Sequence, residues 1–226
     1  MSQPTVPQTT DYLFHFCDRF GHYAVDRVPG HILQMSPRER LASILAEQEI
    51  RAFPQHYGGH PVVCFSEGGE NLDHARFLVE RCNVQPWGVG FKREQLARYG
   101  AGPVISLTSN ADDALIPLLA ASGNAHGVDT LRAFCSLYAP NPQPPNFNVS
   151  DWLWYREWRL TVPRDEGPHS AWAIPPNNTP IVVIVGDPDW IPSNSGAINS
   201  SSLWDRATVV SWNATIQSFD PVKEAS

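Results

Sequence analysis

The chain has no long hydrophobic run. Its longest apolar stretches, such as Pro180 to Gly186, are much shorter than the roughly 20 residues that span a bilayer. Its first residues also lack the basic-then-apolar pattern of a secretion signal. We therefore expect a cytoplasmic protein that makes no contact with membranes.

Basic residues are scarce as well. The 226 residues include 16 Lys plus Arg against 23 Asp plus Glu, which gives a formal net charge of −7. This balance excludes a broad positive field for a nucleic-acid backbone and leaves only a local basic groove as an option. Hydrophobic residues make up 42% of the chain and charged residues 17%, a composition that excludes a disordered chain and predicts one folded domain.

Paired cysteines and complete glycine motifs are also missing. The four cysteines show no CxxC spacing, so the sequence predicts neither a zinc site nor a disulfide framework. The glycines at Gly58-Gly59 and at Gly88-Val89-Gly90 lack the spacing and the following helix of a P-loop or a dinucleotide fingerprint. Common nucleotide-binding motifs are therefore excluded.

The predicted elements indicate an α+β fold, with a central mixed or antiparallel sheet flanked by helices. We expect residues 1–10 to form a disordered leader and residues 11–226 to form a single domain. Ser36 and Glu39 form a capping-box pattern around Pro37 and predict a helix that ends near Glu49. Further helices are expected at 72–82, 111–121 and 128–138, and strands at 12–17, 61–66, 87–91, 103–107, 153–162, 180–185 and 207–212.

Two residues on predicted strands are candidates for ligand contact. His15 lies within an apolar strand, where it is either a core histidine with a hydrogen-bond partner or a strand-end residue that binds a ligand hydroxyl. Ser66 follows the apolar Val62–Phe65 and precedes Glu67-Gly68-Gly69. Either the strand delivers this hydroxyl and the Glu67 carboxylate to a ligand-holding loop at the edge of the sheet, or Ser66 caps a turn.

The densest polar pattern lies between Trp152 and Val162. With the two-residue period of a strand, Tyr155, Glu157 and Arg159 share one face, and Arg156 and Trp158 share the other. This predicts a carboxylate flanked by tyrosine and arginine on one surface. An exposed cross-strand salt bridge explains the same residues.

Two weaker hypotheses concern a metal and nucleic acid. Asp187 and Asp189 flank a proline, a pattern that favours a turn over the metal site of a nuclease. The tryptophans near the candidate site either stack on an exposed base of a single strand or belong to the core. They are Trp87, Trp152, Trp154 and Trp158.

The order of these segments forms a pattern that resembles a known family. It comprises the His15 strand, Ile44-Leu45 with Ile50-Arg51 beyond, Val63–Ser66, Trp87–Phe91 and Arg156–Arg159. The pattern resembles the AbiGi-type abortive-infection antitoxin family. That family looks like a distant member of the ADP-ribosyltransferase fold, which includes the DarT toxins. The resemblance covers about Tyr12 to Val162. Cys17 departs from it, since many such enzymes have Thr or Ser two residues after the histidine.

The resemblance implies roles for particular residues. It assigns Glu157, His15 and Arg51 to catalysis, with Glu157 stabilising an oxocarbenium-like centre. His15 and Ser66 would hold the nicotinamide-side ribose of NAD. The full set of implied NAD-binding residues is His15, Phe16, Cys17, Phe65, Ser66 and Tyr155.

The function implied is that of an NAD-dependent ADP-ribosyltransferase or NAD glycohydrolase in phage defence or a toxin–antitoxin pair. NAD would be its substrate, and a single-stranded nucleic acid or a protein its acceptor. The alternative is a non-enzymatic antitoxin or partner-binding module with the same fold. A toxin or antitoxin partner suits either hypothesis, and the Pro-rich segment at Asn141 to Asn148 suits a recognition surface.

Overall fold

A computed structural model describes residues 12–18, 29–54, 60–107, 117, 121, 130–137, 156–163, 170–176, 182–192 and 203–223. The predicted leader, the loop at 141–148, Tyr155 and almost all of the predicted helix at 111–121 lie outside these residues. Within the described ranges, no helix is both long enough and apolar enough to cross a membrane.

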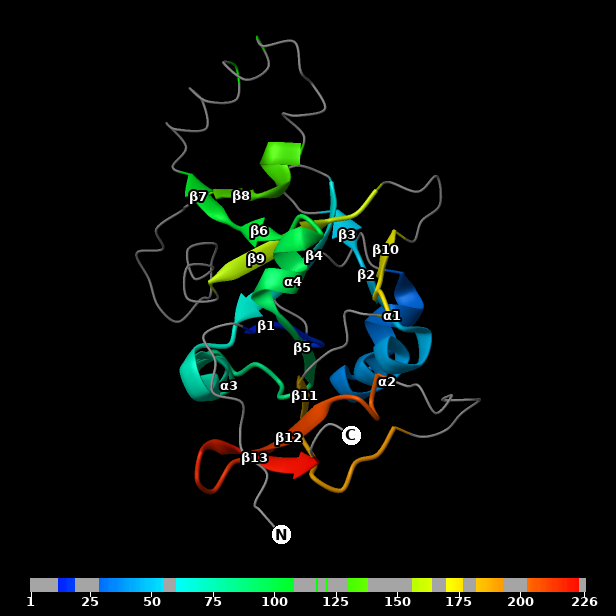
Figure 1. The fold of residues 1–226 in the computed structure, drawn as a ribbon, viewed down its shortest axis with the longest axis vertical. Coiled ribbons are helices and arrows are strands. Elements are labelled where there is room, and N and C mark those ends of the chain that lie inside the picture. The colour runs from blue at the N-terminus through cyan, green and yellow to red at the C-terminus, as the bar shows by residue number, and fades with distance from the viewer. Residues whose placement is uncertain are drawn as a thin grey trace.

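A large mixed sheet of nine strands forms the centre of the molecule (Figure 1). Its order is β13-β12-β11-β5-β1-β4-β9-β6, and β3 adds to β4. Neighbouring strands are antiparallel, except that β11 and β12 are parallel. The strands of this sheet are β1 (Tyr12–Phe16), β3 (Phe53–Pro54), β4 (Pro61–Glu67), β5 (Gly88–Lys92), β6 (Gly102–Pro103), β9 (Glu157–Thr161), β11 (Val182–Val185), β12 (Thr208–Asn213) and β13 (Ser218–Lys223).

Strand β1 is buried on both sides, which explains its almost uninterrupted apolar sequence. It lies between β4 and β5, and Phe14 is paired with Ser66 on one side and with Gly90 on the other. A side chain at position 90 would collide with the Phe14 ring, since an added Cβ would lie 2.4 Å from it. Glycine is therefore required beside this strand.

Different helices pack against the two faces of the sheet. Helices α1 (Gly30–Gln34) and α2 (Pro37–Glu47) lie to one side and α3 (Asp73–Cys82) to the other (Figure 1). We call these sides the α2 face and the α3 face. The α2 face, which includes Leu13 and Phe65, also carries the small ribbon of β2 (Glu49–Arg51) and β10 (Ala171–Ala173) and the helix α4 (Arg93–Arg98). The α3 face includes Phe14 and Ile184, which belong to the same buried cluster as residues of α3.

The predicted start of α2 is confirmed. Ser36 caps the helix by accepting from the backbone of Glu39, and Glu39 accepts from the backbone of Ser36 in return. The helix ends at Glu47, two residues earlier than expected, because Gln48 takes a left-handed conformation and turns the chain into β2.

Three predicted elements differ from the structure. The expected strand at 153–162 includes Arg156, but β9 begins at Glu157 and Arg156 lies in a turn with a left-handed conformation. The expected strand at 103–107 is broken at Val104: β6 pairs with β9, and β7 (Ile105–Leu107) pairs with another strand. That partner is β8 (Cys135–Leu137). The prediction of a helix at 128–138 is therefore wrong for these residues: within the described residues 130–137, only 130–133 are helical. The backbone of β8 forms its hydrogen bonds with the distant β7, and this tertiary pairing overrides the helical pattern.

Candidate functional site

Strands β4 and β9 bring the candidate hydroxyl and carboxylate together. Ser66 is directly opposite Glu157, and Cys64 is directly opposite Arg159. Because Ser66 is also opposite Phe14, all four side chains point toward the α3 face. The prediction that Glu157 and Arg159 share one face is therefore confirmed, whereas Tyr155 lies outside the described residues.

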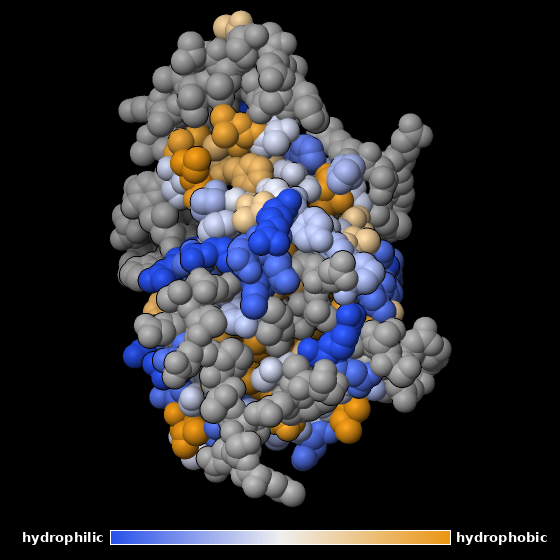
Figure 2. All heavy atoms as spheres, viewed as in Figure 1, coloured by the Kyte–Doolittle hydropathy of each residue, from blue (hydrophilic) through white to orange (hydrophobic). Residues whose placement is uncertain are grey.

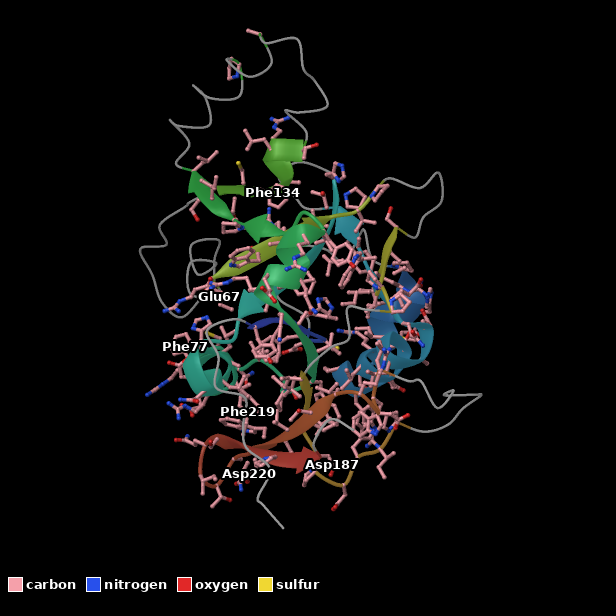
Figure 3. The ribbon with its side chains drawn as sticks, viewed as in Figure 1. Glu67, Phe77, Phe134, Asp187, Phe219 and Asp220 are labelled. Atoms are coloured by element: carbon pink, nitrogen blue, oxygen red, sulfur yellow. The ribbon has the colours of Figure 1, made fainter. Side chains whose placement is uncertain are left out.

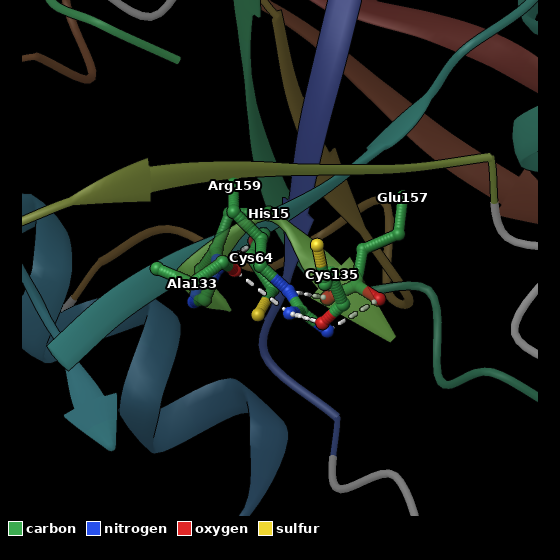
Figure 4. A network of polar contacts seen from close by, with 6 residues as sticks. All are labelled: His15, Cys64, Ala133, Cys135, Glu157 and Arg159. Atoms are coloured by element: carbon green, nitrogen blue, oxygen red, sulfur yellow. Dashed lines mark hydrogen bonds and ion pairs between the residues drawn. The ribbon is translucent and has the colours of Figure 1, made fainter. Parts of the chain in front are cut away.

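Glu157 and Arg159 form a buried ion pair (Figure 4). Arg159 Nε donates to Glu157 Oε1 at 2.9 Å and Nη2 donates to Oε2 at 3.3 Å, while the two side chains are only 5% and 6% exposed. Nη1 donates to the carbonyl oxygens of Ala133 and Cys135 at 2.8 and 2.9 Å. The alternative of an exposed salt bridge is excluded for this pair, and Glu157 is held in one orientation.

The Cys64 thiol lies against this ion pair. Burial raises its pKa well above the usual range, and the Glu157 carboxylate raises it further, whereas Arg159 lowers it. For Arg159, burial alone lowers the pKa, but Glu157 and Cys64 outweigh that effect and raise it. At neutral pH the thiol is therefore protonated and the guanidinium is charged, so Cys64 is a poor nucleophile.

His15 lies on the neighbouring strand but on the opposite face. It alternates with Phe14, and its ring contacts Phe65 edge-on at a centroid distance of 6.0 Å, on the α2 face. Nδ1 donates to the Cys64 carbonyl at 2.9 Å. Burial lowers the pKa of His15, so the ring is neutral and Nε2 is its acceptor nitrogen.

The remaining candidates lie on or next to β1, β2 and β4. Phe16 and Phe65 are buried, on the α3 and α2 faces respectively. Cys17 is also buried on the α2 face, and burial raises the pKa of its thiol to about 12. Arg51 is on β2, partly exposed, and its Nη2 lies 3.3 Å from Glu47 Oε2. The structure therefore brings together Ser66 and Glu157, with His15 one strand away on the other face.

A second carboxylate lies at the same end of β4, on the α2 face. Trp158 Nε1 donates to Glu67 Oε1 at 3.1 Å. Two arginines approach the carboxylate: Arg156 Nη1 is 3.7 Å from Oε2 and Arg93 Nη1 is 3.9 Å from Oε1. The Arg93 guanidinium also lies over the Trp158 ring, 6.0 Å from its centroid. The sequence places the Glu67 carboxylate beside Ser66 at the edge of the sheet, but nothing in the sequence pattern connects it with Arg93.

Arg156 has an unusual backbone conformation. Its φ of 44° lies in the left-handed region, which costs a residue other than glycine roughly 1–2 kcal/mol. The side chain is 59% exposed, and an exposed ion pair at 3.7 Å contributes only about 0–1 kcal/mol. The contact with Glu67 therefore does not by itself offset the strain. Such residues are concentrated at functional sites.

Both carboxylates line one cavity of about 230 Å³ at this end of the sheet. Its walls come from the ends of β4 and β9 and from the segment that joins β6 to β7. A band of hydrophilic side chains crosses this view of the molecule (Figure 2), and Glu67 lies at the tip of β4 (Figure 3). The lining residues are Glu67, Pro103, Val104, Ser106, Arg156, Glu157 and Trp158.

The other end of the sheet offers less chemistry. A cavity of about 430 Å³ lies beside β12 and β13, and among the described residues of its lining Asp220 is the charged one; Asn213 Nδ2 donates to that carboxylate at 2.8 Å. Asp187 lies nearby and far from Glu67 (Figure 3); its Oδ1 accepts from the backbone of Asp189 at 3.0 Å. This contact is typical of a turn, as the sequence favoured. Among the described residues no group of three His, Cys, Asp or Glu could hold a metal ion.

Two of the four tryptophans proposed for stacking are described. Trp87 is partly buried against the α2-face core and meets Trp190 edge-on at 5.3 Å, so it packs as a core residue. Trp158 is partly buried and lines the cavity near Glu67. Trp152 and Trp154 lie outside the described residues.

Comparison of the chain with family models, with curated proteins and with solved structures finds no match.

Proposed function

We propose that the chain is an NAD-dependent ADP-ribosyltransferase or NAD glycohydrolase that acts in phage defence or in a toxin–antitoxin pair. The supporting observation is the adjacency of three strands. β1, β4 and β9 are consecutive in the sheet, and they carry His15, Ser66 and Glu157. These are the first-strand histidine, second-strand hydroxyl and late-strand glutamate that the family resemblance implies.

In this proposal Glu157 is the catalytic carboxylate. It lines the cavity and is held in one orientation by Arg159, as a group that stabilises an oxocarbenium-like centre must be. The glycosidic bond of NAD breaks and nicotinamide leaves with the bonding electrons. The acceptor then bonds to the ribose carbon and loses its proton, water being the acceptor in a glycohydrolase. Ser66, on the same face as Glu157, supplies a hydrogen bond to the ribose, whereas His15 lies on the opposite face of the sheet.

Nicotinamide release tests this function directly. The purified chain is mixed with NAD alone and with candidate DNA, RNA and protein acceptors. Release by the native chain and its loss in Glu157→Gln are expected, because the amide cannot stabilise a developing positive charge. Glu94→Gln, which changes an exposed glutamate on α4, serves as the control. Absence of release with every acceptor contradicts the catalytic proposal.

The second candidate is a non-enzymatic antitoxin or partner-binding module with this fold. Two observations favour it: Glu157 is engaged by both Nε and Nη2 of Arg159, and His15 faces away from Glu157. A pull-down from the native host distinguishes the two. A stoichiometric partner whose binding survives Glu157→Gln, without NAD turnover, supports the binding module.

A further inference from the structure

The Cys64 thiol is part of the polar cluster around Glu157. We propose that Cys64 is a positioning residue, whose thiol donates a hydrogen bond to the Glu157 carboxylate and, together with Arg159, holds that carboxylate toward the reacting ribose. The inference rests on the proposed glycosyl transfer. It adds to that reaction a residue that acts through Glu157 rather than on NAD itself.

Strand register places the thiol beside the ion pair. Cys64 is directly opposite Arg159, and Ser66, two residues further along β4, is directly opposite Glu157. Because residues two apart on a strand point to the same face, the thiol, the guanidinium and the carboxylate all point toward the α3 face. Directly opposite side chains have Cβ atoms only about 4.5–5.5 Å apart. Figure 4 shows Cys64 within the cluster that Arg159 and Glu157 form.

The backbone that carries the thiol is held from the opposite face. The Cys64 carbonyl oxygen accepts from His15 Nδ1 at 2.9 Å. Val63 and Phe65, on either side of Cys64, are buried in the α2-face core. Strand β4 itself lies between β1 and β9 near the middle of the large sheet. The thiol is therefore attached to a rigid part of the fold, as a positioning group must be.

The donors of Arg159 leave room for the thiol. A guanidinium carries five N–H donors. Nη1 donates to the carbonyl oxygens of Ala133 and Cys135, and Nε and Nη2 each donate once to Glu157. One further N–H is left for the Cys64 sulfur, with which Arg159 also shares a hydrogen bond. The thiol in turn is hydrogen-bonded to Glu157, so the three side chains form a closed ring.

The direction of the bond between thiol and carboxylate follows from protonation. Burial raises the pKa of the Cys64 thiol well above its usual range, and Glu157 raises it further. The S–H is therefore present at neutral pH, and a carboxylate is the acceptor. A carboxylate offers about four lone-pair sites. Arg159 uses two of them and the thiol a third, which restricts how the Glu157 carboxylate can turn.

A cysteine that merely fills space in the core would be buried in the same way. Three substitutions of Cys64 separate this role from the positioning role. Cys64→Ser keeps a donor of similar size, Cys64→Val keeps an apolar side chain of similar size, and Cys64→Ala keeps neither. A positioning thiol predicts that serine replaces cysteine best, whereas a space-filling thiol predicts that valine does.

Nicotinamide release by the full chain at several NAD concentrations provides the first measurement. We expect kcat to fall about tenfold in Cys64→Ala and Cys64→Val with KM unchanged, because a misdirected carboxylate weakens stabilisation of the transition state and not NAD binding. Cys64→Ser should restore kcat to within about threefold of the native value. Cys82→Val, which changes a partly buried cysteine at the end of α3, should leave kcat unchanged.

A double-mutant cycle tests the contact without requiring activity. The equilibrium constant of unfolding is measured in urea for the native chain, Cys64→Ala, Glu157→Gln and the double variant. We expect the effect of the double variant to be smaller than the product of the single effects by about threefold, because the shared hydrogen bond is lost only once. Equal values would show that the thiol and the carboxylate are not coupled.

Three results would overturn the proposal: a native kcat in Cys64→Ala, a higher kcat in Cys64→Val than in Cys64→Ser, or additive effects in the cycle. Absence of nicotinamide release by the native chain would instead contradict the glycosyl transfer on which the inference rests. Because the cycle is measured without NAD, failure of the contact and failure of the proposed reaction are distinguishable.

Discussion

Two carboxylates at one end of the sheet differ in nearly every physical respect. Glu157, on the α3 face, is buried and bonded to Arg159 at 2.9 and 3.3 Å. Glu67, on the α2 face, is 25% exposed and lies 3.7 and 3.9 Å from two arginines. Glu67 follows Ser66, the cross-strand partner of Glu157, so a shift of one position along β4 separates the two environments.

The difference shows how burial determines what an arginine–glutamate pair can do. The buried pair has no alternative partners in water, so its geometry is fixed and its disruption is costly. The exposed contacts compete with water and are weakened by salt. The buried pair therefore holds its carboxylate in one orientation, whereas the contacts at Glu67 hold theirs only weakly.

Removing the charge from the buried arginine should have the largest effect. Arg159→Met leaves Glu157 as a buried, unpaired carboxylate. It also removes the Nη1 group that donates hydrogen bonds to two backbone carbonyl oxygens. We expect the free energy of unfolding, measured by urea denaturation, to fall by about 3–5 kcal/mol. The double variant Glu157→Leu/Arg159→Met should recover part of that loss. A change in Arg159→Met no larger than for an exposed arginine would remove the contrast between the two pairs.

Neutralising the buried carboxylate should have a smaller effect. Glu157→Gln keeps the shape and one acceptor oxygen but leaves Arg159 without a negative partner. We expect a loss of about 1–3 kcal/mol in the same urea experiment, because a hydrogen bond to a charged group is weakened. Equal losses in this variant and in Arg159→Met would show that the charge of Glu157, rather than the arginine's bonds to the backbone, determines the stability.

The pH dependence of stability should report on His15, which lies on β1 with its ring on the α2 face. Burial lowers the pKa of folded His15 below its ordinary value of 6.5, so the unfolded chain binds more protons below that pH. Stability should therefore fall as the pH drops below 6.5, by at most about 1.4 kcal/mol at pH 5.5. Thermal unfolding at pH 7.5 and 5.5 measures the change. It should be smaller in His15→Gln, and an equal fall in both proteins would assign it to other groups.

The smallest change in stability is expected at the exposed carboxylate. Glu67→Gln should alter the free energy of unfolding by less than about 1 kcal/mol, because its ion pairs are long and partly exposed. The amide oxygen can still accept from Trp158 Nε1, which preserves that contact. Urea denaturation at low and high salt measures this change in the free energy of unfolding. A loss as large as that of Glu157→Gln would show that exposure does not separate the two sites.

The parts of the fold that depend on local pattern could be predicted. The capping box at Ser36 and the alternation that places Glu157 with Arg159 follow from neighbouring residues, and both are confirmed. Strand β8 and the Glu67 cluster could not be predicted, because each depends on segments distant in the sequence. Cys135 pairs with Ile105, and Arg93 reaches Glu67 from a different element. The opposite orientation of His15 likewise depends on strand pairing.

The central position of β1 has a consequence for how the chain folds. This strand precedes both of its neighbours, β4 and β5, in the chain, so Phe14 lacks its two cross-strand partners until Ser66 and Gly90 have emerged. Contacts between residues so distant in sequence form slowly, because the chain entropy is lost before the contacts reward it. During synthesis the apolar Tyr12–Phe16 is therefore an exposed, unpaired strand, and it is the segment that chaperones would have to shield from aggregation.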